Sequence, residues 1–182
     1  MKSDKHDASG TGAMNDLRLG AARKRLAESR NQEDAIDGVR EIVANFLGSE
    51  ELGLFRVDRE AAAFHVFWSF GIDLEEYNLL QALGDAGLKR VMGGECHVEL
   101  LAGQCVGEMG RARAFVPIRF QNQTIAVLAI LRLLPQKLDF DDSDMKLFKL
   151  LSDEAGKPLF GSGAPGPGAG SQPVSERPGI GA

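Results

Sequence analysis

The side chains with the most reactive chemistry in this sequence are two cysteines and three histidines. Cys96 and Cys105 lie nine residues apart, with no CxxC pair beside them, and His6, His65 and His97 are dispersed along the chain. A thiol redox reaction needs a thiolate of lowered pKa close to a resolving cysteine, and a zinc site needs three or four converging ligands. The spacing is more typical of one half-buried cysteine and one loop cysteine. We therefore expect no catalytic residue, no metal and no cofactor.

The size and charge of the chain exclude several functional classes. Its 182 residues are 43% hydrophobic and 26% charged, which suits one core of ordinary size. With a net charge of -5 and no sustained basic face, it is not expected to bind nucleic acid. The longest apolar run, 125–134, is interrupted by Arg132 and is about half the length that a bilayer requires. No apolar block follows the polar first residues, so we expect a cytoplasmic protein with no membrane partner.

Composition divides the chain into two tails and a folded middle. Residues 161–182 are mostly Gly, Pro, Ser and Ala, and residues 1–13 are polar, so both ranges are predicted to be disordered. Residues 14–47 have helical periodicity, as one helix or as two. Asn31 is placed to cap the second part, whose apolar stripe predicts a core-facing helix. The stripe consists of Ala35, Val39, Ile42 and Phe46.

The first part of this helical range, residues 14–31, carries a thinner apolar stripe flanked by basic residues. A thin stripe flanked by charge suits a partner helix better than a domain core. We therefore expect this helix to pair with a second copy of the chain in a homodimer. The predicted interface residues are Leu17, Leu19, Ala22 and Leu26.

The middle of the chain is predicted to be a sheet with insertions. Strand patterns at 52–57 and 63–70 are separated by a short polar turn, which predicts a hairpin. Aromatic residues lie on both faces of the second strand, so we expect both faces to be covered. A short helix is expected over 74–83, ended by glycines, and a short strand over 95–99.

The range from Ala112 to Phe148 is the most informative. A strand over 114–120, a polar corner and an apolar run over 124–134 predict two neighbouring strands joined by a tight turn. Asp141 and Asp144 are then placed to form the capping box of a helix.

Two further features define this last helix. Phe140 and Met145 occupy the two positions of a hydrophobic staple. The helix should end near Pro158, because proline lacks the backbone donor and clashes with the preceding turn.

The order helix, hairpin, helix, short strand, loop, two long strands and helix over residues 32–160 resembles a GAF domain. The corresponding residues are Phe115–Ile118 in the fourth strand, Ile125–Leu128 in the fifth, and Phe140 with Asp144 at the last helix. The resemblance implies an α/β (α+β) fold with an antiparallel sheet of roughly five or six strands. A bundle of terminal helices would cover one face, and short helices and loops would roof a ligand pocket on the other.

Branches of this family differ in pocket chemistry. This chain resembles the cyclic-nucleotide-binding members only in Phe140 and Asp144, which are half of their motif. It resembles the bilin-binding members only in the Cys96–His97 pair. Free methionine sulfoxide reductases use several cysteines, and this chain lacks their Gly- and Cys-rich stretches. A thiol-based reductase is kept as an alternative, and so is small-anion sensing by polar side chains under the roof.

The resemblance implies a non-enzymatic signalling or regulatory GAF module that binds a separate signalling protein and, as an open point, a small ligand. The candidate ligand-binding residues are His65, Phe67, Ser69, Cys96, Arg111 and Arg113. The alternative is a pure protein-interaction adaptor. In that case the pocket would be filled by Phe67, Met92 and Met109, whereas a polar cavity around His65 and Arg113 would favour sensing.

Overall fold

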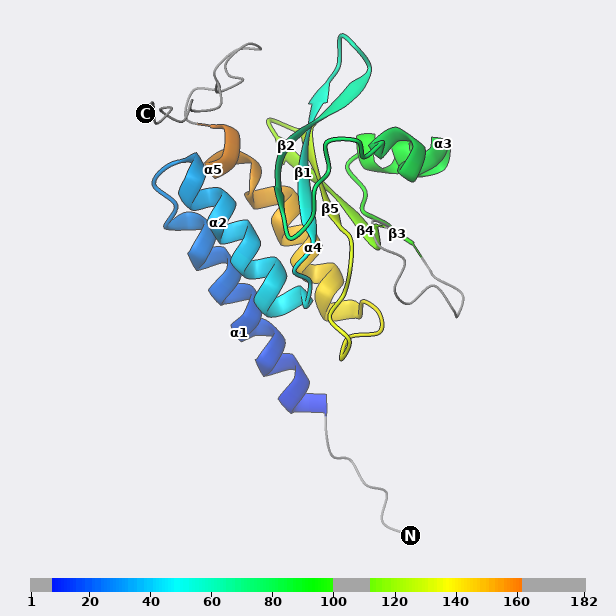
Figure 1. Ribbon diagram of the computed structural model, residues 1–182. Coiled ribbons are helices and arrows are strands. Elements are labelled where there is room, and N and C mark those ends of the chain that lie inside the picture. The colour runs from blue at the N-terminus through cyan, green and yellow to red at the C-terminus, as the bar shows by residue number, and fades with distance from the viewer. Residues whose placement is uncertain (1–7, 100–111, 162–182) are drawn as a thin grey trace, which may run out of the picture.

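The computed structural model describes residues 8–99 and 112–161. The predictions for residues 1–7 and 162–182, and the candidate residues Cys105, Met109 and Arg111, lie outside this described part. Figure 1 shows a central sheet with most helices on one side and a single helix on the other. The strand order is β2-β1-β5-β4-β3, and every neighbouring pair is antiparallel. The predicted fold class is confirmed.

The N-terminal helical range forms two helices. α1 (Ala8–Ala27) and α2 (Gln32–Ile42) are joined by a short turn, and a π-helical turn, Val43–Leu47, continues α2. The chain breaks at Asn31 because its side-chain oxygen caps α2, accepting the N–H of Asp34 at 2.8 Å. α1 starts at Ala8, so residues 8–13, predicted as part of a tail, are helical.

The predicted dimer interface on α1 is wrong for two of its four residues. Ala22 and Leu26 are fully buried in the core of the same chain, and Leu19 packs against that core. α1 lies against both α2 and α4 (Asp142–Glu154), so its thin stripe is used within the chain. Only Leu17 faces outward.

Both predicted hairpins are present. β1 (Leu52–Asp58) pairs with β2 (Ala63–Phe70), and β4 (Ala114–Phe120) pairs with β5 (Gln123–Ile130). Gln121 and Asn122, at the second turn, both have positive φ angles, as a tight turn matching the twist of two antiparallel strands requires.

The two faces of the second strand, which were expected to be covered, are covered only in part: Phe67 and Trp68 pack against one core and Phe64 against the other. β2 is at the edge of the sheet, and its residues are only half-buried or exposed. β1, β4 and β5 have neighbours on both sides and are largely buried. Strand order, which the residues of β2 do not reveal, decides this difference.

The second helical layer consists of α3 (Leu79–Met92), which begins five residues later than predicted. Asn78 caps α3 by accepting the N–H of Gln81 at 3.0 Å, and Gly84 kinks the helix with a φ of 59°. Leu74, predicted to be helical, is a buried loop residue instead. The short strand β3 (His97–Val98) follows.

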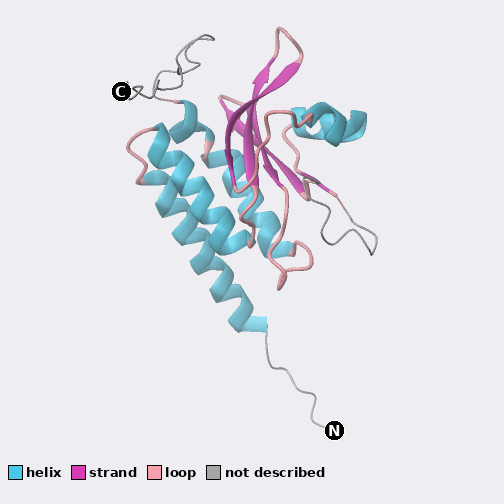
Figure 2. Ribbon diagram, in the orientation of Figure 1, coloured by secondary structure: helices cyan, strands magenta, loops and turns pink. Residues whose placement is uncertain are grey.

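The sheet separates two apolar cores. Figure 2 shows that helices lie on both sides of the sheet. Alternate residues of each strand point to opposite faces, so neighbouring residues enter different cores. The first core lies against the terminal helices and includes Leu54, Val116, Leu128, Phe148 and Leu151. The second lies against α3 and includes Phe55, Phe115, Val127, Leu83 and Val91.

The last helix, α4, begins as predicted. Asp141 accepts the N–H of Asp144 at 3.0 Å, and the Asp144 carboxylate accepts the N–H of Asp141 at 2.9 Å, which completes the capping box. The predicted staple is wrong: Met145 is exposed, and Phe140 packs edge-on against Phe148, with ring centroids 4.9 Å apart.

α4 ends at Glu154, and a short helix, α5 (Gly156–Phe160), follows directly. Pro158 lies inside α5, within its first turn, where a missing backbone donor is tolerated. Among the described residues, no helix has both the length and the apolar character that crossing a membrane requires.

Candidate functional site

The residues predicted to bind a ligand do not share one site. His65, Phe67 and Ser69 lie on the edge strand β2, whereas Cys96 and Arg113 flank β3 and β4. β1 and β5 separate the two groups, and strands lie about 4.8 Å apart, so they are separated by roughly 14 Å.

Two of the three predicted residues of β2, His65 and Phe67, have structural roles. His65 is mostly exposed and lies 3.5 Å from Asp58, whose carboxylate accepts the N–H groups of Glu60 and Ala61 in the hairpin turn. These backbone hydrogen bonds, first that of Ala61, hold the pKa of Asp58 below its usual value. Phe67 lies at a register shift and packs on Phe160, on the helical side of the sheet.

Cys96 is on the same helical side, packed against the first core. Burial raises the pKa of its thiol to about 11, and the nearby Asp153 carboxylate adds to this shift. Reactive thiols have lowered pKa values and an electropositive setting. Cys96 therefore has the properties of a structural residue.

Arg113 anchors the start of β4. Its guanidinium donates to the Leu138 carbonyl at 3.1 Å and lies 3.6 Å from the Asp139 carboxylate. The side chain is mostly buried and ties β4 to the loop before α4. His65 and Arg113 therefore do not line a common cavity, and Phe67 and Met92 do not fill one together, because Met92 faces the β1–β2 hairpin.

The structure instead brings together a polar cluster under α3. His97 on β3 stacks on Phe115 of β4, with ring centroids 6.1 Å apart and planes at 19°. Its Nε2 lies 2.9 Å from a Glu99 carboxylate oxygen, and its side chain is 18% exposed. α3 passes over the ring at Gly87, where an added Cβ would come within 3.0 Å of the imidazole. This glycine permits the close approach of α3 to His97.

Tyr77 adds a phenol to this cluster. Burial raises the pKa of Tyr77, a hydrogen bond to the Ala112 backbone opposes that shift, and the Glu99 carboxylate adds to it. Its ring packs on Phe55, 5.8 Å away between centroids. We call His97, Glu99 and Tyr77, with the ring of Phe115, the roof cluster.

The roof cluster contains one hydrogen-bond acceptor without a described partner. When His97 Nε2 donates to Glu99, the neutral ring presents Nδ1 as an acceptor. Nδ1 is buried and has no hydrogen-bond partner among the described residues. A buried unpaired nitrogen costs about 1–3 kcal/mol, so a donor supplied by a ligand would be stabilising. Within residues 8–99 and 112–161, no group of three or more His, Cys, Asp or Glu side chains is placed to hold a metal ion.

Sequence reasoning missed the roof cluster as a site. The alternation of residues 95–99 placed His97 opposite Cys96 and Val98, which was the available signal for a polar face. Tyr77 gave no signal, because it lies twenty residues before His97 and only tertiary packing places it against the second core.

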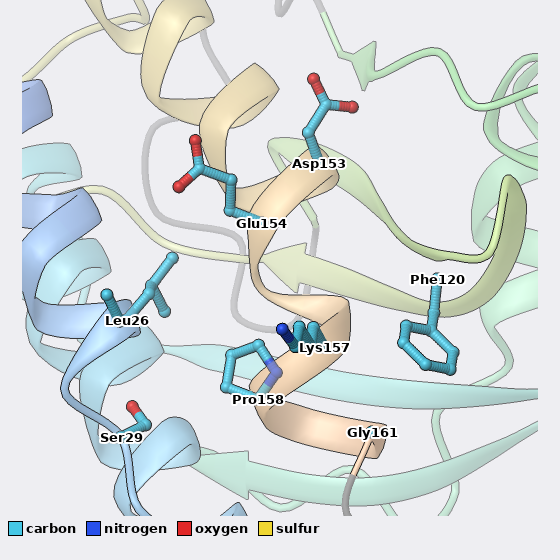
Figure 3. Close-up of a pocket in the computed structure, with 9 residues that line it drawn as sticks. Leu26, Ser29, Phe120, Asp153, Glu154, Lys157, Pro158 and Gly161 are labelled. Atoms are coloured by element: carbon cyan, nitrogen blue, oxygen red, sulfur yellow. The ribbon is translucent and has the colours of Figure 1, made fainter.

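A hollow lies on the helical side of the sheet, between the end of α1, α5 and the end of β4 (Figure 3). Its volume is about 630 Å³, and Figure 3 shows Leu26 and Phe120 at opposite sides of it. Asp153 pairs with Lys149 at 2.8 Å, and Glu154 pairs with Arg23 at 2.8 Å. Each of the two carboxylates beside this hollow therefore lies next to a cation.

Comparison with known proteins supports the fold. No protein-family model matches the sequence, and no curated protein matches it significantly. Among solved structures, the GAF domain of a phosphoenolpyruvate-protein phosphotransferase from Coxiella burnetii is similar, with a TM-score of 0.59 and 18% identity. The match covers 81% of this chain and 94% of that one.

Two further structures are similar. The GAF domain of the potassium sensor histidine kinase KdpD from Escherichia coli has a TM-score of 0.52 and 14% identity, covering 79% of this chain and 94% of that one. A free methionine-R-sulfoxide reductase from Neisseria meningitidis, in complex with its substrate, has a TM-score of 0.52 and 17% identity, covering 87% and 96%. The chain therefore has the fold of a GAF domain.

Proposed function

We propose that this protein is a non-enzymatic regulatory module that binds a small polar ligand at the roof cluster and acts on a separate partner protein. The observation that carries the proposal is the His97 imidazole, which is largely buried, oriented by Glu99 and unpaired at Nδ1 among the described residues. A cluster that lacks a nucleophile but offers an acceptor, a phenol and an aromatic face suits binding better than chemistry.

The structural comparisons agree with a regulatory role. One similar structure is the GAF domain of a sensor histidine kinase, and another is the GAF domain of a phosphotransferase. A ligand would act through its different affinities for two arrangements of the domain. α3 is the element suited to respond, because it covers His97 at Gly87 and is kinked at Gly84.

The reductase alternative gains no support from Cys96. The similar reductase shows that this fold can carry that chemistry. Cys96, however, lies on the face of the sheet opposite the second core, and the pKa of its thiol is raised to about 11. A thiol with that pKa is almost wholly protonated at neutral pH, so it is a poor nucleophile.

Native mass spectrometry of the purified chain, together with its absorbance spectrum, tests ligand binding directly. We expect the purified protein to retain a small molecule. If it retains none, at least one member of a set of small polar molecules should raise the melting temperature of the protein. His97→Leu should weaken its binding about tenfold or more, because the ligand loses one buried hydrogen bond worth about 1.4 kcal/mol or more. His65→Leu, an exposed histidine on β2, is the matched control. Retention of the ligand by His97→Leu at the affinity of the wild type would reject the roof cluster.

The homodimer is also proposed, with a corrected surface. Met14 and Leu17 lie three residues apart on α1, so they share one face of the helix, and Leu17 is 72% exposed. Figure 1 shows the first turns of α1 extending past the other helices. Light scattering should give the mass of a dimer for the wild type and of a monomer for Leu17→Glu. Leu138→Glu, at another highly exposed leucine, should remain dimeric. A wild-type monomer contradicts this surface.

A further inference from the structure

β2 has an outer edge that no other described strand covers. The strand pairs with β1 on one side, and no described hydrogen bond reaches its backbone from the other. Its eight residues, Ala63–Phe70, contain no Lys, Arg, Asp, Glu or Pro. Natural edge strands usually carry such residues, which discourage pairing with another chain. An edge without them is available for an additional strand.

An apolar groove lies between the β1–β2 hairpin and α3, at the start of β2. Its volume is about 270 Å³. The apolar side chains that line it are Val57, Phe64, Leu80, Leu88 and Met92. We call this feature the edge groove.

We propose that the outer edge of β2 and the edge groove together dock an extended segment of a partner protein. The unpaired backbone groups of β2 repeat at the spacing of a strand, so an extended backbone satisfies them. Val66 pairs with Phe55 of the second core, and Phe70 pairs with Leu52 of the first, so these two exposed side chains lie on opposite faces. An added strand would pack alternate side chains against each of them.

The charges around the edge groove define the chemistry of this segment. Asp58 accepts two backbone N–H groups and pairs with His65, and Arg59 donates to the Thr124 carbonyl. On the other face, the Arg40 guanidinium lies over the Phe70 ring at 5.2 Å. Because the described lining of the edge groove is apolar apart from Asp58 and Arg59, and both of these are bonded to backbone groups, we expect a neutral segment with apolar side chains at alternate positions.

The size of the site favours a peptide segment over a second copy of the chain. The edge is eight residues long, about 26 Å at the rise of a strand. One added strand and a small groove bury less than the roughly 800 Å² per partner of a stable dimer. A short segment that binds transiently fits this area.

α3 connects this site to the roof cluster. Gly87 covers His97, and the next residue, Leu88, lines the edge groove. If a ligand shifts α3, the width of the edge groove changes, and peptide and ligand alter each other's affinity by the same factor. Only this coupling rests on the proposed function; the docking site does not.

The test is selection of peptides from a displayed random library against the full chain. Each selected peptide is synthesised and titrated, and the fluorescence of Trp68 is followed. Trp68 is the only tryptophan in the sequence and lies on β2 itself. We expect neutral peptides with alternating apolar residues that shift this emission. N-methylation of alternate backbone amides should abolish binding, because it removes the strand hydrogen bonds and leaves the side chains.

Variants assign the binding site. Val66→Lys and Leu80→Lys should each weaken binding about tenfold or more, because they place a charge at the edge and at the groove. Met145→Lys is the matched control, since Met145 and Val66 are both 40% exposed. All peptide titrations are done with no small molecule added, which separates a failed docking site from a failed ligand site.

Three results of the peptide experiments would overturn the proposal. The first is that no peptide of this pattern is enriched, and the second is that Val66→Lys and Leu80→Lys do not change the affinity of the peptides. The third is that the peptides still bind after N-methylation. Self-association that Val66→Lys abolishes would also overturn it, because the occupant would then be a second copy.

Discussion

Replacing Asp144 by asparagine tests how the terminal helices are held together. The Asp144 side chain is fully buried at the start of α4. One oxygen lies 2.6 Å from Lys137 Nζ and accepts the Asp141 N–H at 2.9 Å, and the other lies 3.3 Å from the Arg18 guanidinium. Arg18 also donates to Ser143 at 2.7 Å and to the Phe46 carbonyl. Asp144 therefore joins α1 and the loop before α4 to the helix that it caps.

The substitution keeps the shape of the side chain and removes its charge. Removal of one partner from a buried ion pair costs about 3–5 kcal/mol, because the other charge remains buried. Here Arg18 and Lys137 are 23% and 20% exposed, so water partly compensates them. We expect Asp144→Asn to lower the free energy of unfolding by about 2–4 kcal/mol. This loss corresponds to a fall of roughly 10 °C in melting temperature for a protein of this size.

Urea unfolding at two salt concentrations, followed by circular dichroism, measures this loss. The control is Asp142→Asn, two residues earlier in the same helix. Asp142 is exposed, so this variant loses only the interaction of the carboxylate with the helix dipole, about 0.3–1 kcal/mol. Salt should reduce the effect at Asp142 and leave most of the effect at Asp144, because buried pairs are screened less. Equal losses for the two variants would refute the argument from burial.

Two other predictions concern stability. Gly71→Ala should lower the free energy of unfolding by roughly 3 kcal/mol, because φ is +74° and the new Cβ would lie 2.0 Å from the Glu50 carbonyl oxygen. Gly84→Ala is the control and should cost about 1 kcal/mol, because φ is +59° but nothing lies within 4 Å of the new Cβ. Equal losses in urea unfolding would argue against the clash. The folded-state pKa of Cys96, about 11, lies above its usual 9.0, so the wild type should lose up to about 2–3 kcal/mol relative to Cys96→Ala as pH rises from 9 to 11. Parallel unfolding curves across that range would show that the thiol is not buried as described.

Local patterns in the sequence determined the elements and their order. The capping box of Asp141 and Asp144 requires only residues three positions apart, and the β4–β5 hairpin requires only two strand patterns and a polar corner. Since a fold is largely the order and type of its elements, these signals sufficed for the resemblance to a GAF domain, which the structure confirms. Boundaries were less accurate, as at α3, which was expected to begin at Leu74 but begins after its capping residue Asn78.

Tertiary structure alone decided how each element is used. Strand order placed β2 at the edge, which exposes Val66 and separates His65 from Arg113. The packing of α1 on α2 and α4 buried Ala22 and Leu26 within the chain. Periodicity reports which face of an element is apolar but not which neighbour covers it, because that depends on contacts between residues distant in sequence. The close approach of Gly87 to His97 is such a contact, so the roof cluster emerges only once α3 lies over the sheet.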